Sequence, residues 1–81
     1  MRAIGVGDTV YYARIFHTTA TYELCELHVR TVYPDCFVGV DKATKRAFIL
    51  GYEECDISIF DDKSIATVVV KEAEKRKRVN N

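Results

Sequence analysis

YELCELHVRTVY, residues 22–33, contains the pattern from which the fold of this chain is predicted. Its middle part alternates small or apolar side chains with polar ones, which is the two-residue period of a half-buried β-strand. The first set is Cys25, Leu27, Val29 and Thr31, and the polar set is Glu26, His28 and Arg30. At both ends the apolar residues change parity, which indicates a bend or bulge that carries the strand from one side of a barrel to the other. We therefore expect one long, strongly bent strand.

Four shorter strands are predicted around this one. They span residues 9–16, 36–40, 46–50 and 57–60. The first is dense in β-branched and aromatic residues and follows the turn Gly7-Asp8, and Pro34-Asp35 separates the long strand from the third. The small and polar residues 17–21 form an exposed loop, while the polar residues 41–45 join the third and fourth strands as a hairpin. The acidic residues 52–56 form a short turn or a single helical turn before the last strand.

The hydrophobic period changes after residue 60, and the sequence predicts a helix over residues 61–78. Asp61 is a suitable N-cap, and Asp62 places a negative charge in the first turn, where the helix dipole favours it. Phe60 and Ile65 stand at the two positions of a hydrophobic staple. The apolar residues expected to pack repeat at helical spacing and are Ile65, Val68, Val69 and Ala73.

These elements predict a mainly β fold with one helix. Five strands in a meander, the second of them long and bent, match a five-stranded Src-homology-3-like small barrel, a curled antiparallel sheet, over residues 6–60, followed by a C-terminal α-helix. The alternative is a curled antiparallel sheet with the helix laid across its open face. Because 81 residues have room for only one hydrophobic core, we expect residues 1–81 to form a single domain.

Composition and charge exclude several classes of protein. A chain that is 48% hydrophobic and 30% charged is typical of globular rather than disordered proteins. Twelve Lys and Arg balance twelve Asp and Glu, which disfavours a nucleic-acid binder that relies on bulk positive charge. The sequence has neither an apolar run of signal-peptide length near its start nor the roughly 20 apolar residues that cross a bilayer. It therefore predicts a cytoplasmic protein without a membrane partner.

The cysteines and the other reactive side chains indicate no catalytic chemistry. Cys25, Cys36 and Cys55 are odd in number and widely spaced, so we expect neither a disulfide framework nor a zinc site. Cys25 and Cys36 lie in predicted strands, where a free cysteine usually behaves as a small buried hydrophobic residue. No nucleophile stands beside a base, and the acidic residues between 53 and 62 lack the spacing of a calcium loop. We expect a protein that is not an enzyme and holds no cofactor or metal.

Three segments carry a resemblance to known proteins. They are VGDTVYY at residues 6–12, FVGVD at 37–41 and DISIFDDKSIA at 56–66. Over residues 6–76 the chain resembles small uncharacterised proteins of prophages and mobile elements in Gram-positive bacteria, whose usual ending is a short strand followed by a capped helix. The segments mark turns and caps, so no catalytic residue is carried over. The resemblance implies a phage-accessory setting, in which small proteins are often stoichiometric inhibitors of host defences, anti-CRISPR proteins among them.

Two binding hypotheses from different function classes follow. The first is a protein-binding module that inhibits a host or phage protein, such as a component of a CRISPR-Cas defence system. Its expected contact residues are exposed aromatic, charged and loop residues, namely Tyr11, His17, Tyr22, Glu26, Arg30 and Tyr33. The second is a nucleic-acid-binding module that uses the barrel face and the basic end of the helix, Lys71, Lys75, Arg76, Lys77 and Arg78. A third alternative is a structural homo-oligomer, for example a homodimer, that pairs exposed strand edges.

Overall fold

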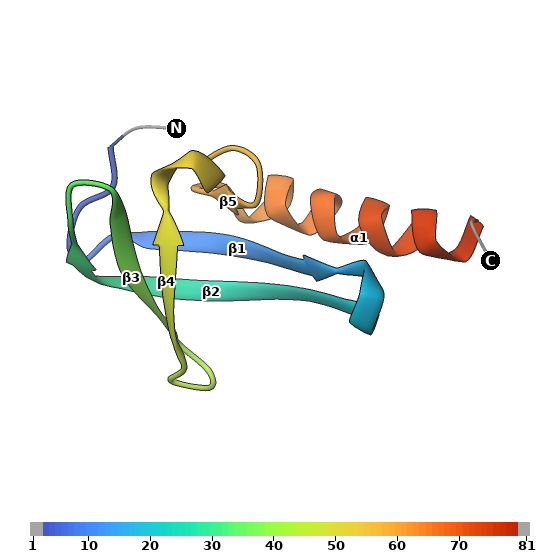
Figure 1. Ribbon diagram of the computed structural model, residues 1–81, viewed down its shortest axis with the longest axis horizontal. Helices are drawn as coiled ribbons and strands as arrows, with labels where there is room; N and C mark the ends of the chain where they lie inside the picture. Colours follow the sequence, from blue (N-terminus) through green and yellow to red (C-terminus); the bar gives the residue numbers. More distant parts are fainter. Residues whose placement is uncertain (1–2, 80–81) are drawn as a thin grey trace.

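The computed structural model describes residues 3–79, and the side chains of residues 3–76. It consists of one five-stranded antiparallel sheet and one C-terminal helix (Figure 1). The elements are β1 (Thr9–Phe16), η1 (His17–Thr19), β2 (Thr21–Val32), β3 (Cys36–Asp41), β4 (Ala47–Gly51), η2 (Tyr52–Glu54), β5 (Ile59–Phe60) and α1 (Lys63–Val79). The strand order is β4-β3-β2-β1-β5, so within the described residues β4 and β5 are the two edges and the sheet is open. The predicted mainly β fold with one C-terminal helix is confirmed.

β2 is the long strand that the sequence predicts, and it changes partner along its length. Residues 21–28 pair with β1, whereas residues 27–32 pair with β3. A register shift interrupts the second pairing between Val29 and Thr31, which leaves Arg30 as the extra residue of a β-bulge. In Figure 1 the β3–β4 hairpin crosses the ribbon formed by β1 and β2. The bulge lies within the alternating stretch, whereas the sequence predicted a bend at the two ends of that stretch.

The main hydrophobic core lies on one face of the sheet, called here the inner face. Its buried members are Val10, Cys25, Leu27, Val29, Phe37, Leu50 and Ile59. Cys25, Leu27 and Val29 share this face because successive side chains of a strand point to opposite sides. Gly39 lies opposite Val29, and a Cβ atom on Gly39 would stand 3.0 Å from Cδ1 of Leu27. A glycine at this position therefore allows β3 to approach Leu27 closely.

α1 packs on the opposite face, called the outer face, over the part of β1 and β2 that lies beyond β3. Ala13 of β1, Phe60 of β5 and Ala66 of α1 are buried together there. The residues packed around them are Tyr11, Ile15, Leu24, Val69 and Val70. Because Ala13 and Ala66 are small, the helix can lie close to the sheet.

The start of α1 differs from the prediction. The helix begins at Lys63 instead of residue 61, and its N-cap is Asp62 instead of Asp61. Oδ1 of Asp62 accepts a hydrogen bond of 2.9 Å from the N–H of Ser64, which is the interaction of an N-cap side chain with the first turn. Ile65 is therefore the third helical residue and not the fourth, so the predicted staple positions are wrong.

The prediction of which helix residues pack against the sheet is only partly confirmed. Val69 and Ala73 lie on it, but Ile65 is 50% exposed and Val68 is 58% exposed. Ala66, which is fully buried, takes their place against the sheet. Neighbouring residues of a helix lie about 100° apart around its axis, so this sequence offers two adjacent apolar stripes. The close contact with the sheet selects the stripe that carries the smaller side chain.

β5 is shorter than predicted, because the chain turns just before it. Asp56 has φ 65°, in the left-handed region, and the N–H groups of Ile57 and Ser58 donate to the C=O of Glu54. Ile57 and Ser58 therefore belong to a turn, and the strand begins at Ile59. The helical turn predicted before this strand is present as η2.

The three cysteines are free, and Cys25 is buried as predicted, whereas Cys36 and Cys55 are partly exposed. Among the residues that the structure describes, no three His, Cys, Asp or Glu side chains come together in a group that could hold a metal ion. The described part of the chain also contains no helix of the length and hydropathy needed to cross a membrane.

Candidate protein-binding groove

The part of β2 that lies beyond β3 has an open edge. The main-chain groups of Val29 bond to the residues just before β1, whereas the C=O of Glu26 accepts a 3.0 Å hydrogen bond from the N–H of Lys42 on the opposite side. Because the main-chain groups of alternate residues point to opposite edges of a strand, those of Tyr22 and Leu24 point the same way as those of Glu26. No strand in the described chain pairs with this edge before Glu26.

A groove of about 610 Å³ runs along this edge. Residues 23–26 of β2 form one wall, and residues 41–44 with Arg46, in the turn between β3 and β4, form the other. The described lining includes no residue of α1, so the helix leaves the groove uncovered. An unpaired strand edge beside a groove is the arrangement in which an extended peptide adds a strand to a sheet.

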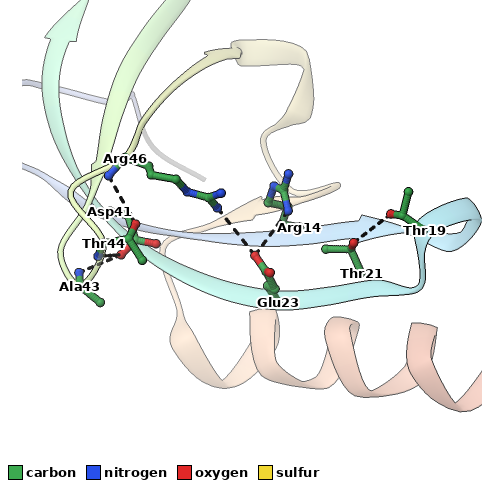
Figure 2. Close-up of polar contacts among 8 residues, drawn as sticks. All are labelled: Arg14, Thr19, Thr21, Glu23, Asp41, Ala43, Thr44 and Arg46. Carbon is green, nitrogen blue, oxygen red and sulfur yellow. Dashed lines mark hydrogen bonds and ion pairs between the residues drawn. The ribbon is translucent and has the colours of Figure 1, made fainter.

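Two arginines share one carboxylate beside the groove (Figure 2). Nη1 of Arg14 lies 3.4 Å from Oε2 of Glu23, and Nη2 of Arg46 lies 3.8 Å from the same oxygen. The guanidinium of Arg14 lies 5.0 Å from the ring centre of Phe16, and that of Arg46 lies 5.1 Å from the ring centre of Phe48, both within cation–π range. Exposed ion pairs of this kind contribute only about 0 to 1 kcal/mol. The cluster keeps one positive charge without a matching carboxylate, and an acidic ligand could displace Glu23 at little cost.

Asp41 fixes the turn that forms the second wall. Its Oδ1 accepts hydrogen bonds from the N–H of Ala43 at 2.8 Å and of Thr44 at 3.1 Å (Figure 2). The side chain is only 6% exposed. The main-chain N–H of Thr44, followed by that of Ala43, lowers the pKa of Asp41, although burial acts in the opposite direction. The carboxylate is therefore ionised at neutral pH and holds the turn in one conformation.

Replacing Asp41 with asparagine should reduce the free energy of unfolding at neutral pH and reduce it less in acid. Because the pKa of Asp41 is lower in the folded chain, its stabilising effect is complete above the unfolded value of about 3.9 and is lost as the pH falls through the folded value. Urea unfolding of the wild type and Asp41→Asn, at neutral pH and at the most acidic pH at which both remain folded, measures this difference. A deficit of the same size at both pH values would contradict a role for the charge.

Cys25 lies in the first wall of the groove, where its thiol faces Asp41. Burial, followed by the negative charges of Asp41 and Glu23, raises the pKa of Cys25 to about 11. The thiol is therefore protonated at neutral pH, and a protonated thiol is a poor nucleophile. Its contribution to the groove is packing.

The aromatic residues predicted for protein binding lie at different places. His17 and Tyr22 meet at the tip of the β1–β2 ribbon, where Nδ1 of His17 lies 2.9 Å from the hydroxyl oxygen of Tyr22. Tyr11 is half-buried and packs against the helix cluster. Tyr33 is exposed just after β2, and its C=O accepts a 2.8 Å hydrogen bond from the hydroxyl of Tyr52. Of these residues, Tyr22 belongs to the open edge.

Glu26 and Arg30 are the charged residues predicted for protein binding, and they lie at different places along β2. Oε2 of Glu26 lies 3.0 Å from Nζ of Lys42, and Glu26 lines the groove. Arg30 is exposed at the bulge and lies outside the groove. The structure therefore brings Tyr22 and Glu26 to one edge, with His17 against Tyr22, and leaves Tyr11, Arg30 and Tyr33 elsewhere.

Sequence reasoning missed Arg14, Glu23 and Arg46. Arg14 and Glu23 face each other because the pairing of β1 with β2 begins at Phe16 and Thr21. The only signal of this contact in the sequence was that Arg14 and Glu23 carry opposite charges at equal distances from the loop between β1 and β2. Arg46 reaches the pair because the β3–β4 hairpin crosses the ribbon, and no local pattern carries that information.

The basic residues predicted for nucleic-acid binding all belong to the C-terminal part of α1. Lys71, Lys75 and Arg76 are exposed. The side chains of Lys77 and Arg78 lie outside the described residues.

No protein-family model matches the chain, and no curated protein and no solved structure matches it either. The function is therefore inferred from the open edge, the groove and the charges around them.

Proposed function

We propose that the protein is a non-enzymatic protein-binding module that captures an extended segment of a partner protein along the open edge of β2. The observation that carries this proposal is the unpaired strand edge that coincides with a groove of about 610 Å³. The main-chain groups of Tyr22 and Leu24 would continue the ladder and supply affinity, and the groove would accept alternate side chains and supply specificity.

The charges around the groove indicate the chemistry of the captured segment. Arg14 and Arg46 share a single carboxylate, so an acidic side chain of the partner can bind one guanidinium in a two-pronged, charge-assisted contact. Cys25 and Ala43 add small apolar surface to the groove. Because alternate residues of a strand face the same way, the segment should carry an acidic residue two positions from a small apolar one.

The fold and the resemblance support a more specific version of this proposal. The strand order β4-β3-β2-β1-β5 and the bulge in β2 support an open variant of the Src-homology-3-like barrel. The resemblance to prophage proteins supports a captured segment that belongs to a host protein, with this chain as a stoichiometric inhibitor of a defence system such as CRISPR-Cas. Inhibition would follow from occupation of a surface that the host protein needs.

Replacing Ala43 with tryptophan should prevent capture, because the indole ring fills the groove while the main chain of the turn is unchanged. The probes are peptides selected on the wild-type protein from a displayed library of random sequences. We expect Ala43→Trp to bind them about tenfold more weakly or worse, a loss of about 1.4 kcal/mol, as measured by fluorescence anisotropy. Ala47→Trp is the matched control, since Ala47 is exposed on β4 and does not line the groove. It should bind as the wild type does.

Main-chain recognition has its own readout. Two methylated versions of a selected peptide are compared, one methylated at the amide nitrogens of its odd-numbered residues and one at those of its even-numbered residues. One version should lose binding and the other should keep it, because only alternate amides of the peptide face β2. The amide NMR signals of Tyr22 and Leu24 should shift on binding. The proposal would be contradicted by peptides that bind Ala43→Trp and the wild type equally, or by a peptide whose two methylated versions both still bind. Self-association that Ala43→Trp abolishes would favour the homo-oligomer instead.

A further inference from the structure

A second charged surface lies on the outer face, behind the turn that forms the second wall of the groove. It is a depression of about 470 Å³ between β2, β3 and the start of that turn. The residues that line it are His28, Arg30, Val40, Asp41, Lys42 and Lys45. No described residue of α1 covers it, so this part of the outer face is open to solvent.

Positive charge is in excess in this depression. Arg30, Lys42 and Lys45 line it together with a single acidic residue, Asp41, whose carboxylate is hydrogen-bonded within its own turn. Nζ of Lys42 is held by Glu26 at 3.0 Å. Neither Arg30 nor Lys45 forms an ion pair within the part of the chain whose side chains are described. These two cations are therefore available to a ligand.

Both available cations stand where the main chain is irregular. Arg30 is the extra residue of the β-bulge in β2, where the regular alternation is interrupted. Lys45 has φ 66°, in the left-handed region, and its N–H donates a 2.8 Å hydrogen bond to the C=O of Asp41. Glycine or asparagine is favoured in that conformation, so a lysine there is unfavourable for the turn. Lysine at this position is explained if its charge has a use of its own.

We propose that the depression binds the phosphodiester backbone of a nucleic acid through Arg30 and Lys45, with His28 beside them. A guanidinium matches a phosphate with two parallel hydrogen bonds, and a lysine adds a point charge. The acidic residues of η2, of the turn before β5 and of the link between β5 and α1 belong to segments that lie at the other end of β4 (Figure 1). They are Glu53, Glu54, Asp56, Asp61 and Asp62. Arg30 and Lys45 therefore lie away from these five carboxylates, which favours the approach of a polyanion to the depression although the net charge is zero.

This site differs from the basic helix end, which the sequence suggested for nucleic acid together with the barrel face. It lies on the sheet, and it holds its cations on a bulge and a tight turn, whereas Lys71, Lys75 and Arg76 stand on one exposed helix. Contacts to phosphate carry no base information, so binding should be independent of sequence. The logarithm of affinity should fall with the logarithm of salt concentration by about 0.7 to 0.9 for each phosphate that is contacted.

The test compares two double variants of the full chain. Fluorescence anisotropy with labelled single-stranded and duplex DNA, at salt concentrations from about 50 to 200 mM, gives the affinity and its salt slope. Arg30→Ala with Lys45→Asn should bind about tenfold more weakly at low salt and lose about 1.5 units of slope. Lys71→Ala with Lys75→Ala removes the same charge from the helix and should change the affinity less than about twofold.

Three results would overturn the proposal. They are an equal loss in the two double variants, a larger loss in the helix variant, and no DNA binding by the wild type at the lowest salt concentration. Lys45→Gly separates binding from folding: it should raise the unfolding temperature while it weakens DNA binding, because glycine suits the left-handed conformation but lacks the charge. Lys45→Gly that stabilises the chain and binds DNA as the wild type does would also overturn it.

Discussion

Replacing Phe37 with alanine is expected to lower the free energy of unfolding by about 3 to 5 kcal/mol. Phe37 is fully buried, and its ring stacks on that of Tyr52 with the ring centres 5.7 Å apart. It also lies opposite Leu50 in the pairing of β3 with β4, so its loss leaves a cavity between two elements of the inner face. A domain of this size is stable by only about 4 to 12 kcal/mol. Urea unfolding followed by circular dichroism should therefore show a marginally folded protein.

Phe16→Ala is the control for this prediction. Phe16 is 45% exposed at the end of β1, and its contact with the guanidinium of Arg14 is at the surface. We expect a loss of no more than about 1 kcal/mol. If Phe37→Ala and Phe16→Ala were equally stable, Phe37 would not be at the centre of the core.

Replacing Ala66 with glutamate is expected to cost about 3 kcal/mol or more and to release α1 from the sheet. Ala66 is fully buried with Ala13 and Phe60, so a longer side chain has no space there. The new carboxylate would also lose its water in an apolar contact. Thermal unfolding should show the loss of stability, and limited proteolysis should show cleavage within α1 while the sheet remains intact.

Ile65→Glu tests the same helix one residue earlier. Ile65 is 50% exposed, so the substitution should change the free energy of unfolding by less than about 0.5 kcal/mol. The sequence alone predicts that Ile65 packs, and therefore predicts a large effect of this change. A large loss in Ile65→Glu together with a small loss in Ala66→Glu would show that the helix packs by the face that the sequence suggested.

The strands could be predicted from the sequence because their signals are local. β1 begins and ends where its β-branched and aromatic residues do, and the alternation along β2 assigns Cys25, Leu27 and Val29 to the inner face. The presence of the helix could also be predicted from local signals, but the residue at which it begins could not. Asp61 and Asp62 are both suitable caps, and the structure shows that Asp62 is the one that binds the first turn.

The candidate groove was predicted less well than the strands. Tyr22 and Glu26 were expected among the contact residues, and they belong to the open edge and the groove wall. Arg14, Glu23 and Arg46 were not expected, because each appears as an ordinary surface charge in its own strand. Their contact requires the register of β1 with β2 and the position of the β3–β4 hairpin at the same time.

The mainly β class, the long second strand, the hairpin turn and the presence of a C-terminal helix could all be predicted from the sequence. Each of these depends on residues that are close together in the chain, so propensity, periodicity and turn chemistry are sufficient. Three features follow only from the three-dimensional packing: the bulge at Arg30, the helix face that carries Ala66, and the edge of β2 that stays open. These features depend on contacts between distant segments, where side-chain volume and strand register select one of several arrangements that the local sequence allows.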